Sequence, residues 1–242
     1  MKSAAAAFLL CLMAGQAAAQ ITSATYADPT DRYPHGVLGT TTTYAALDVT
    51  LADGSHQLAG WAPGMVFEDT APRLFDLDGD GAPEVITVES ADTKGARLAV
   101  WGLNEAGQLT SRAFTPFLGM RFRWLAVAGA ADLDGDGLIE IAYVDRPHLA
   151  KVLRILRYRQ IDAKTAQLEP VAAVPDLTNH SFGDPKIFGG IRDCDGLPAV
   201  VTTSADGLRI MATMLQGGRA VTVNLGPNDA ADSLSDAMAC KR

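Results

Sequence analysis

The sequence predicts an all-β fold, a small β-propeller built from four-stranded blades of about 55 residues each. An acidic nine-residue segment occurs twice, starting at Asp76 and again 56 residues later at Asp132. Short apolar and β-branched runs surround both copies in the same order, with Gly and Asp turns between them. No segment of useful length has helical periodicity. Together these features indicate a repeated β unit.

The first segment, residues 1–19, is expected to be a secretory signal peptide. Lys2 precedes an apolar run from Ala4 to Gly15, and three alanines ending at Ala19 form a small-residue exit. The run is too short to span a bilayer comfortably. We therefore expect cleavage after Ala19, a secreted or periplasmic protein, and no insertion into the membrane.

The remaining residues, 20–242, are expected to form a single β-propeller domain. Their number favours four blades, and five blades or an open stack of blades are the alternatives. Ring closure normally joins strands from both ends of the chain, because exposed edges invite aggregation, and Ile21–Ala27 is a candidate for that strand. The expected divisions are a partial or degenerate first blade at 21–60, blades at 65–116, 121–175 and 180–225, and a C-terminal tail at 226–242.

Each unit has its own strand signals. In the first, the apolar-rich runs Tyr44–Leu51 and His56–Gly60 flank an Asp-Gly turn, which predicts a hairpin. The other three units each contain four runs in a common order. The entering strands are expected at 72–75, 127–131 and 187–191, the second strands at 84–89, 140–145 and 198–203, the third at 96–101, 150–156 and 208–212, and the fourth at 108–115, 167–174 and 219–225.

The two acidic segments are predicted calcium sites. Three carboxylates at alternate positions repel one another unless a cation lies between them. Ca²⁺ takes about six to eight oxygen ligands in a flexible geometry. A loop with carboxylates at positions 1, 3 and 5 and a fourth carboxylate further along the chain suits this ion. The glycines permit the positive φ values needed to wrap a chain around an ion. The acidic residues of the two copies are Asp76, Asp78, Asp80 and Glu84, and Asp132, Asp134, Asp136 and Glu140.

The helix–loop–helix calcium hand does not fit these segments. That motif requires Glu at position 12 of the loop, where this chain has Thr87 and Tyr143. Each acidic segment instead runs directly into a β-branched stretch typical of a strand. The remaining alternative is an acidic surface turn that binds nothing.

A third, incomplete copy begins at Asp193, 61 residues after Asp132. It keeps Asp193 and Asp195 but lacks the third acid, and Ala199 stands where the late Glu would be, so no ion is expected there. This copy contains Cys194, and the tail contains Cys240. Two cysteines in an exported chain fit one disulfide, and two unpaired cysteines are the alternative.

The acidic segments, with the strands around them, resemble the FG-GAP/VCBS repeat family, whose propeller is similar to the head of integrin α subunits. The resemblance is to its small exported bacterial type. It implies that the loop acids chelate Ca²⁺ at two sites on the rim of the ring, between the first and second strands of a blade. The carbonyls of Ala82 and Leu138 would complete the protein ligands. The family's Phe-Gly signature occurs only loosely, at Phe182-Gly183 and Phe188-Gly189.

Charge and motifs exclude several functions. The formal net charge is −8, the opposite of the balance that phosphate binding needs, so no nucleic-acid partner is expected. The basic run Lys151–Arg159 mostly alternates with apolar residues and is interpreted as a solvated strand face. The histidines form no metal-binding motif and no G-x-S-x-G elbow is present. His35, His56, His148 and His180 are therefore interpreted as structural.

The predicted function is an exported, calcium-stabilised binding or structural module and not an enzyme. The alternative is a carbohydrate- or peptide-binding surface protein that uses the propeller face, and an enzyme with an unrecognised catalytic loop is less favoured. Aromatic residues are available for either blade packing or a binding groove. They are Trp61, Trp101, Trp124, Tyr26, Tyr33, Tyr44 and Tyr158. The expected partner is an unknown protein or glycan, and the protein is expected to be a monomer.

Overall fold

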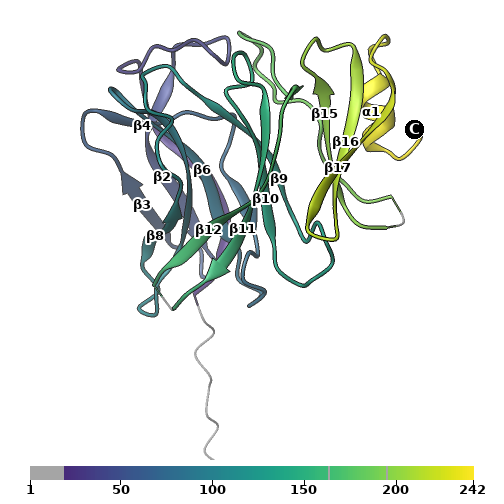
Figure 1. Ribbon diagram of the computed structural model, residues 1–242. Coiled ribbons are helices and arrows are strands. Elements are labelled where there is room, and N and C mark those ends of the chain that lie inside the picture. Colours follow the sequence, from purple (N-terminus) through teal and green to yellow (C-terminus); the bar gives the residue numbers. More distant parts are fainter. Residues whose placement is uncertain (1–18, 163, 195) are drawn as a thin grey trace, which may run out of the picture.

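The computed structural model describes residues 19–162, 164–194 and 196–242 (Figure 1). In these ranges seventeen strands are followed by one short helix, which confirms the all-β prediction. The expected signal peptide lies outside the described residues apart from Ala19. None of the described helices is long and apolar enough to cross a membrane.

The N-terminal group has three strands: β1 (Ile21–Thr30), β2 (Thr43–Leu51) and β3 (His56–Gly60). Both β1 and β3 pair antiparallel with β2. The β2–β3 turn contains the expected Asp-Gly pair, with Gly54 at φ +82° and the Asp53 carboxylate accepting the Ser55 N–H at 2.9 Å. The predicted hairpin is therefore present.

The second group contains β4 (Met65–Phe67), β5 (Arg73–Phe75), β6 (Glu84–Ala91), β7 (Gly95–Leu103) and β8 (Leu109–Phe114). Both β4 and β5 pair with β6, at opposite ends, so together they form one interrupted inner strand. One further pairing, Tyr44 with Phe67, joins β4 to β2 and makes the first two groups a continuous eight-stranded sheet.

The remaining strands form two separate sheets. The four-stranded sheet contains β9 (Leu125–Ala131), β10 (Glu140–Asp145), β11 (Val152–Gln160) and β12 (Ala166–Val174). The five-stranded sheet contains β13 (Leu177–Thr178), β14 (Gly190–Arg192), β15 (Ala199–Ser204), β16 (Arg209–Gln216) and β17 (Arg219–Pro227). Its inner strand is again interrupted, because β13 and β14 pair with opposite ends of β15.

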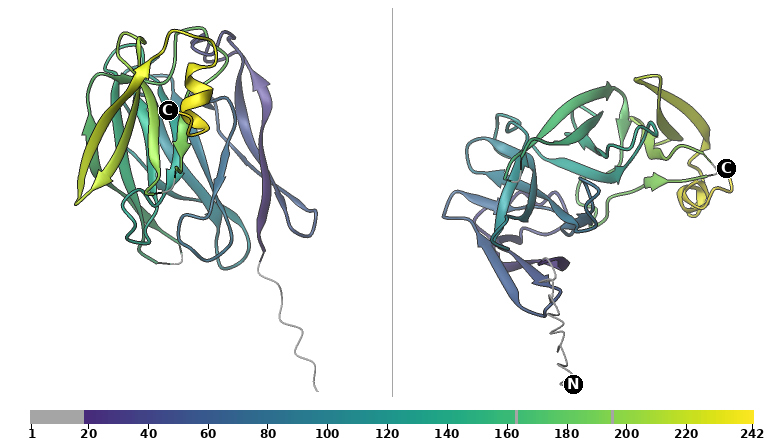
Figure 2. Two further views of the ribbon diagram at one scale, coloured as in Figure 1. Left: turned by 90° about the vertical axis from the view of Figure 1, so that its right-hand side faces the viewer. Right: turned by 90° about the horizontal axis from the view of Figure 1, so that it is seen from below.

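Seen from below in Figure 2, the groups of strands follow one another around an open arc, from the purple β1 at one end to the yellow α1 at the other. Strand β1 pairs with β2, and β17 pairs with β16. The suggestion that Ile21–Ala27 completes a blade with C-terminal strands is therefore wrong. The N-terminal strand finds a full-length partner locally in β2, which satisfies its backbone groups without ring closure.

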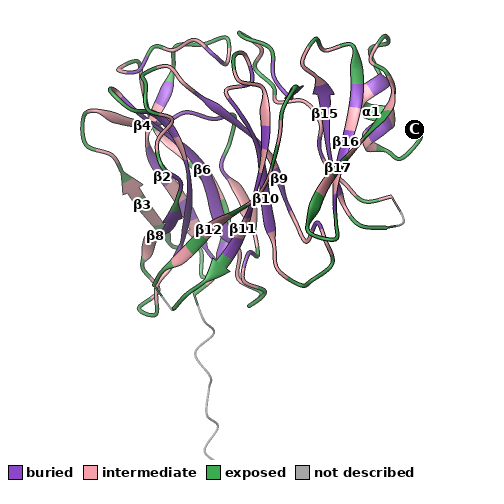
Figure 3. Ribbon diagram, in the orientation of Figure 1, coloured by how far each residue is buried: buried purple, intermediate pink, exposed green. Residues whose placement is uncertain are grey.

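The core lies between successive groups of strands, so the central strands are covered on both faces. Every residue of β6 and of β10 is buried, as the purple ribbons of Figure 3 show. Ile86 packs in the cluster that β6 shares with β9 and β10, whereas its neighbour Val85 packs with β1 and β2. Alternate residues of a strand point to opposite faces, so burial on both faces explains the continuous apolar runs in these segments.

The C-terminal tail contains an unpredicted helix, α1 (Ser233–Met238). Ala237 of this helix is buried against Val201 and Ile210. A disulfide joins Cys194 in the β14–β15 loop to Cys240 just after the helix, with a Cα–Cα distance of 5.6 Å. Six residues are too short for a visible helical period, so packing and the disulfide hold this turn of helix in place.

Loss of the disulfide is expected to destabilise the protein. The bond closes a loop with a sequence separation of 46 residues, for which chain entropy gives about 4 kcal/mol as an upper value. Urea unfolding of Cys240→Ser should show a reduction of the free energy of unfolding up to that size. Reductant should destabilise the wild type and leave a variant lacking both cysteines unchanged. Equal stabilities for the oxidised wild type and Cys240→Ser would contradict this.

Candidate metal centres

The two acidic loops lie at equivalent places in neighbouring sheets. The first connects β5 to β6, and the second connects β9 to β10. Both have the same backbone signature, with φ of +79° and +85° at Gly79 and Gly81, and +78° and +87° at Gly135 and Gly137. Since side chains strongly disfavour these conformations, the glycines allow each chain to wrap around its own carboxylates.

The first carboxylate of each loop holds the loop backbone. Asp76 accepts the N–H of Gly79 at 2.8 Å and that of Gly81 at 3.0 Å. Asp132 accepts the N–H groups of Gly135 and Gly137 at 2.7 and 2.9 Å. In each loop the first carboxylate therefore accepts hydrogen bonds from the backbone N–H groups of both glycines.

The carboxylates at position 5 hold the end of each loop. Asp80 accepts the N–H of Ala82 at 2.7 Å, and Asp136 accepts that of Leu138 at 2.9 Å. The predicted carbonyl ligands Ala82 and Leu138 are thus placed beside the acids of position 5. Asp78 accepts the N–H of Asp80 at 3.2 Å.

The last carboxylate of each loop is the first residue of a central strand. Glu84 and Glu140 are 5% and 0% exposed, so both carboxylates are withdrawn from water. Glu84 accepts the N–H of Leu77 at 3.0 Å, and Glu140 accepts that of Leu133 at 2.9 Å. Both leucines are buried in the core, so this contact ties the loop to the packing beneath it.

The structure brings most of the predicted ligands together. In the first loop, oxygens of Asp76, Asp78 and Glu84 lie within 4.8 Å of one another, and in the second those of Asp132, Asp134 and Asp136 do. Asp80 and Glu140 stand outside these two closest groups. The donors are all oxygens, which is the chemistry of Ca²⁺ and not that of zinc or copper.

Electrostatics in the first loop leave negative charge uncompensated. Burial, then the neighbouring Asp78 and Asp80, raise the pKa of Glu84 to about 7, against a partial opposing effect of the Leu77 N–H and Arg112. The pKa of Asp78 is raised by burial and by Asp80 and Asp76. Among the described residues, no Lys, Arg or His forms an ion pair with an acid of this loop. These residues fit a hard cation, because it would supply the missing positive charge.

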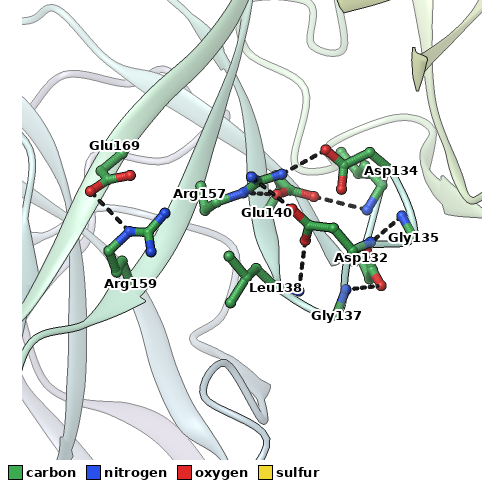
Figure 4. Close-up of polar contacts among 11 residues, drawn as sticks. Asp132, Asp134, Gly135, Gly137, Leu138, Glu140, Arg157, Arg159 and Glu169 are labelled. Carbon is green, nitrogen blue, oxygen red and sulfur yellow. Dashed lines mark hydrogen bonds and ion pairs between the residues drawn. The ribbon is translucent and has the colours of Figure 1, made fainter. Parts of the chain in front are cut away.

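The second loop contains its own positive charge. Arg157, on β11, contacts three of its acids: Nη2 lies 2.7 Å from Asp134, Nη1 lies 2.9 Å from Asp136, and Nε lies 2.6 Å from Glu140 (Figure 4). Burial still raises the pKa of Glu140, but the Leu133 N–H and Arg157 oppose it. The second loop therefore differs from the first in charge although the two agree in backbone shape.

Arg157 is the site residue that the sequence interpretation missed. The sequence predicts a solvated strand face for the run Lys151–Arg159. This prediction holds for Arg159, which is exposed and pairs with Glu169 at 3.0 Å. Arg157 is only 16% exposed. A usable signal was present, because the residue opposite Glu140 on the next strand is Arg157, but strand register is needed to recognise it.

Three of the four histidines, which form no motif in the sequence, lie together at the opposite end of the same strands. His148 Nε2 lies 2.8 Å from His180 Nδ1, and His148 stacks on Trp124 with an interplanar angle of 10°. His35 contacts Glu68 at 2.8 Å. Burial, then His180 and His35, lower the pKa of His148 to about 4. Burial also lowers the pKa of His180, so His148 and His180 are packed neutral, which supports a structural role.

The aromatic residues considered for a binding groove are mostly in the core. Trp101, Trp124, Tyr33 and Tyr158 are buried. Trp61, which is partly exposed, packs edge-on against Trp101 at 5.9 Å between ring centroids. Packing accounts for these side chains.

The fold and the loops define a class: antiparallel repeats of the propeller type, with an acidic loop between the first and second strands. Residues 76–143 match the model of the FG-GAP-like repeat. This stretch, which includes both acidic loops, is therefore similar to an FG-GAP-like repeat, in agreement with the resemblance in sequence. No curated protein matches the chain.

The two buried glutamates are expected to respond oppositely to neutralisation when divalent cations are removed. At pH 7, Glu84→Gln should raise the free energy of unfolding by about 1–2 kcal/mol, because Gln keeps an acceptor for the Leu77 N–H without an uncompensated charge. Glu140→Gln should lower it by a similar amount, because Arg157 loses a charged partner. Urea unfolding in chelator measures both changes. Equal effects of the two substitutions would contradict the difference between the loops.

Acid is expected to weaken the histidine cluster. His148 has a pKa of about 4 in the folded protein, whereas an unfolded histidine has a pKa near 6.5. Between these two pH values the side chain takes up a proton only when the protein unfolds. The contribution of neutral His148 to the free energy of unfolding is therefore complete above pH 6.5 and is lost as the pH falls toward 4. Melting temperatures between pH 7 and pH 5 should therefore fall more steeply in the wild type than in His148→Gln. Parallel profiles would show that His148 does not carry this dependence.

Proposed function

We propose that the protein is an exported calcium-binding module with a binding or structural role, in which Ca²⁺ stabilises the strand–loop–strand units. The observation that carries this proposal is the first loop, where carboxylates of Asp76, Asp78 and Glu84 converge without an ion pair from the described residues. A bound cation would supply the compensating charge that burial of Glu84 demands. The sequence predicts a ligand set in each loop, and the proposal rests on the set of the first loop.

The proposed role of the ion is mechanical. Asp76 and Glu84 lie at the two ends of the first loop, one just after β5 and one at the start of β6. An ion held between them ties two paired strands and, through Glu84 and Leu77, the core. Binding to the folded state alone stabilises it by about 2.7 kcal/mol at an ion concentration about a hundredfold above Kd.

Export supports this role. The disulfide between Cys194 and Cys240 is typical of compartments outside the cytoplasm, which agrees with the signal peptide expected at residues 1–19. Extracellular calcium sites commonly have Kd values of about 10⁻⁴–10⁻³ M. We propose that the protein becomes fully stable only in a calcium-rich compartment, and that it acts there through a protein or glycan partner and not through catalysis.

Calcium titration of the chelator-treated protein tests the proposal. Calorimetry should show binding that is weakened at least about tenfold by Asp78→Ala, since removing a carboxylate ligand lowers the affinity of an oxygen site. Calcium should also raise the melting temperature of the wild type. Asp31→Ala, at an exposed acid outside the loops, is the matched control and should bind like the wild type. A protein that shows neither heat of binding nor a chelator-sensitive melting temperature would refute the proposal.

A further inference from the structure

We infer that the second acidic loop carries its own cation: the Arg157 guanidinium takes the place of a metal ion there, so that the first loop is the calcium-responsive one. This inference rests on the proposed calcium function and distinguishes the two loops within it. Its physical basis is the supply of positive charge to buried carboxylates at the ends of the two central strands.

Four buried acids mark the ends of these two strands. β6 begins at Glu84 and has Glu89 near its far end, and β10 begins at Glu140 and ends at Asp145. All four are at most 5% exposed. Their equivalent placement makes them a matched set in which charge compensation can be compared.

Three of the four acids have an arginine partner on the following strand. Arg97 on β7 lies 2.7 Å from Glu89. Arg154 on β11 lies 2.9 Å from Asp145, and Arg157 lies 2.6 Å from Glu140. Glu84 is the exception among the described residues, since the charged side chains around it form no ion pair with it.

Strand register explains the exception. Glu140 pairs directly with Arg157 across the β10–β11 ladder. In the preceding sheet Val85 pairs with Trp101, which places Gly102 opposite Glu84. A Cβ added at Gly102 would lie 3.5 Å from the Glu84 side chain. The position that supplies a guanidinium to the second loop therefore supplies no side chain to the first.

One guanidinium lies near the first loop and opposes the rise in the pKa of Glu84, but it forms no ion pair with the described acids of this loop. Arg112, on β8, is buried and donates from Nη1 to the carbonyl of Leu103 at 2.8 Å. Its Nε is buried without a hydrogen-bond partner. Asp78, Asp80 and Glu84 line a cavity of about 320 Å³ together with Arg112, so there is space beside the carboxylates.

The second loop has much less to offer an ion. Arg157 engages one oxygen each of Asp134, Asp136 and Glu140 (Figure 4). Of these acids Asp134 keeps one buried oxygen, Oδ1, without a partner. Three of the four acids that would ligate Ca²⁺ in this loop therefore already direct an oxygen to the guanidinium. An ion entering this loop must displace a guanidinium that is tethered beside it and always charged.

Calcium calorimetry on the chelator-treated protein tests the inference with two loop variants. The wild type should show one binding event. Asp78→Ala should abolish it, whereas Asp134→Ala, which alters only the second loop, should leave its affinity within about twofold. Arg157→Gln should show a second binding event, at the second loop. Its affinity for calcium there should be at least about tenfold higher than that of any weak binding by the wild type at the same loop. Arg159→Gln is the matched control, because Arg159 is exposed and pairs with Glu169 instead, and it should show one event only.

Stability provides a second measurement, since Arg157→Gln leaves the loop acids unpaired. This variant should melt at a lower temperature than the wild type in chelator and regain more of its stability than the wild type when calcium is added. Arg159→Gln should follow the wild type in both conditions.

The outcomes separate the inference from the proposed function. Two wild-type events of similar affinity, or one event lost in Asp134→Ala, would overturn the inference while calcium binding stands. No event in the wild type with one event in Arg157→Gln would show that Arg157 blocks the second loop, but it would overturn both the assignment of calcium to the first loop and the proposed function. No event in either protein would overturn both.

Discussion

Burial of a carboxylate at the start of each central strand constrains the structure around it. Glu84 and Glu140 lie where the chain enters β6 and β10, strands that are buried along their whole length. Each carboxylate accepts a backbone N–H from a leucine in the core, so the loop geometry and the core packing depend on the same group. An ionised buried carboxylate is stable only with a compensating charge or a strong set of hydrogen bonds. The differences between the two loops follow from how each one meets that requirement.

The three acidic loops of successive sheets connect equivalent strands in different ways. In the second loop the guanidinium of Arg157 joins three acids, and in the third, incomplete loop Cys194 forms a disulfide with the C-terminal tail. The first loop has neither, and its acids face open space. A cation, an ion pair and a covalent bond can each restrain a hairpin, but they respond to different conditions. Proposed calcium binding would make the first loop respond to the ion, whereas the disulfide makes the third respond to redox conditions.

The opposite ends of the same strands hold the ion pairs of Glu89 with Arg97 and of Asp145 with Arg154, and a cluster of histidine rings. His35, His148 and His180 come from three separate segments and meet around Trp124 and Phe182. The tryptophans pack in this cluster and in the cluster near β2 and β7, where their rings contact other core side chains. The protein thus has one end where loops hold the paired acidic segments and another where loops hold aromatic and histidine rings.

Local sequence determined the strands and the shape of the acidic loops. Alternation, β-branched runs and Asp-Gly turns act over a few residues, so strands such as 140–145 and the hairpin at 44–60 were predicted to within a residue or two. The paired glycines likewise required loops with positive φ. Tertiary structure decided what local signals do not contain. The pairing of β1 with β2 leaves the arc open, and α1 forms by packing against β15 and β16. Arg157 contacts the acids of the second loop, whereas the equivalent position in the first sheet is Gly102, which has no side chain. These outcomes depend on which strands become neighbours and in which register, and a one-residue shift would place a different side chain opposite each buried glutamate.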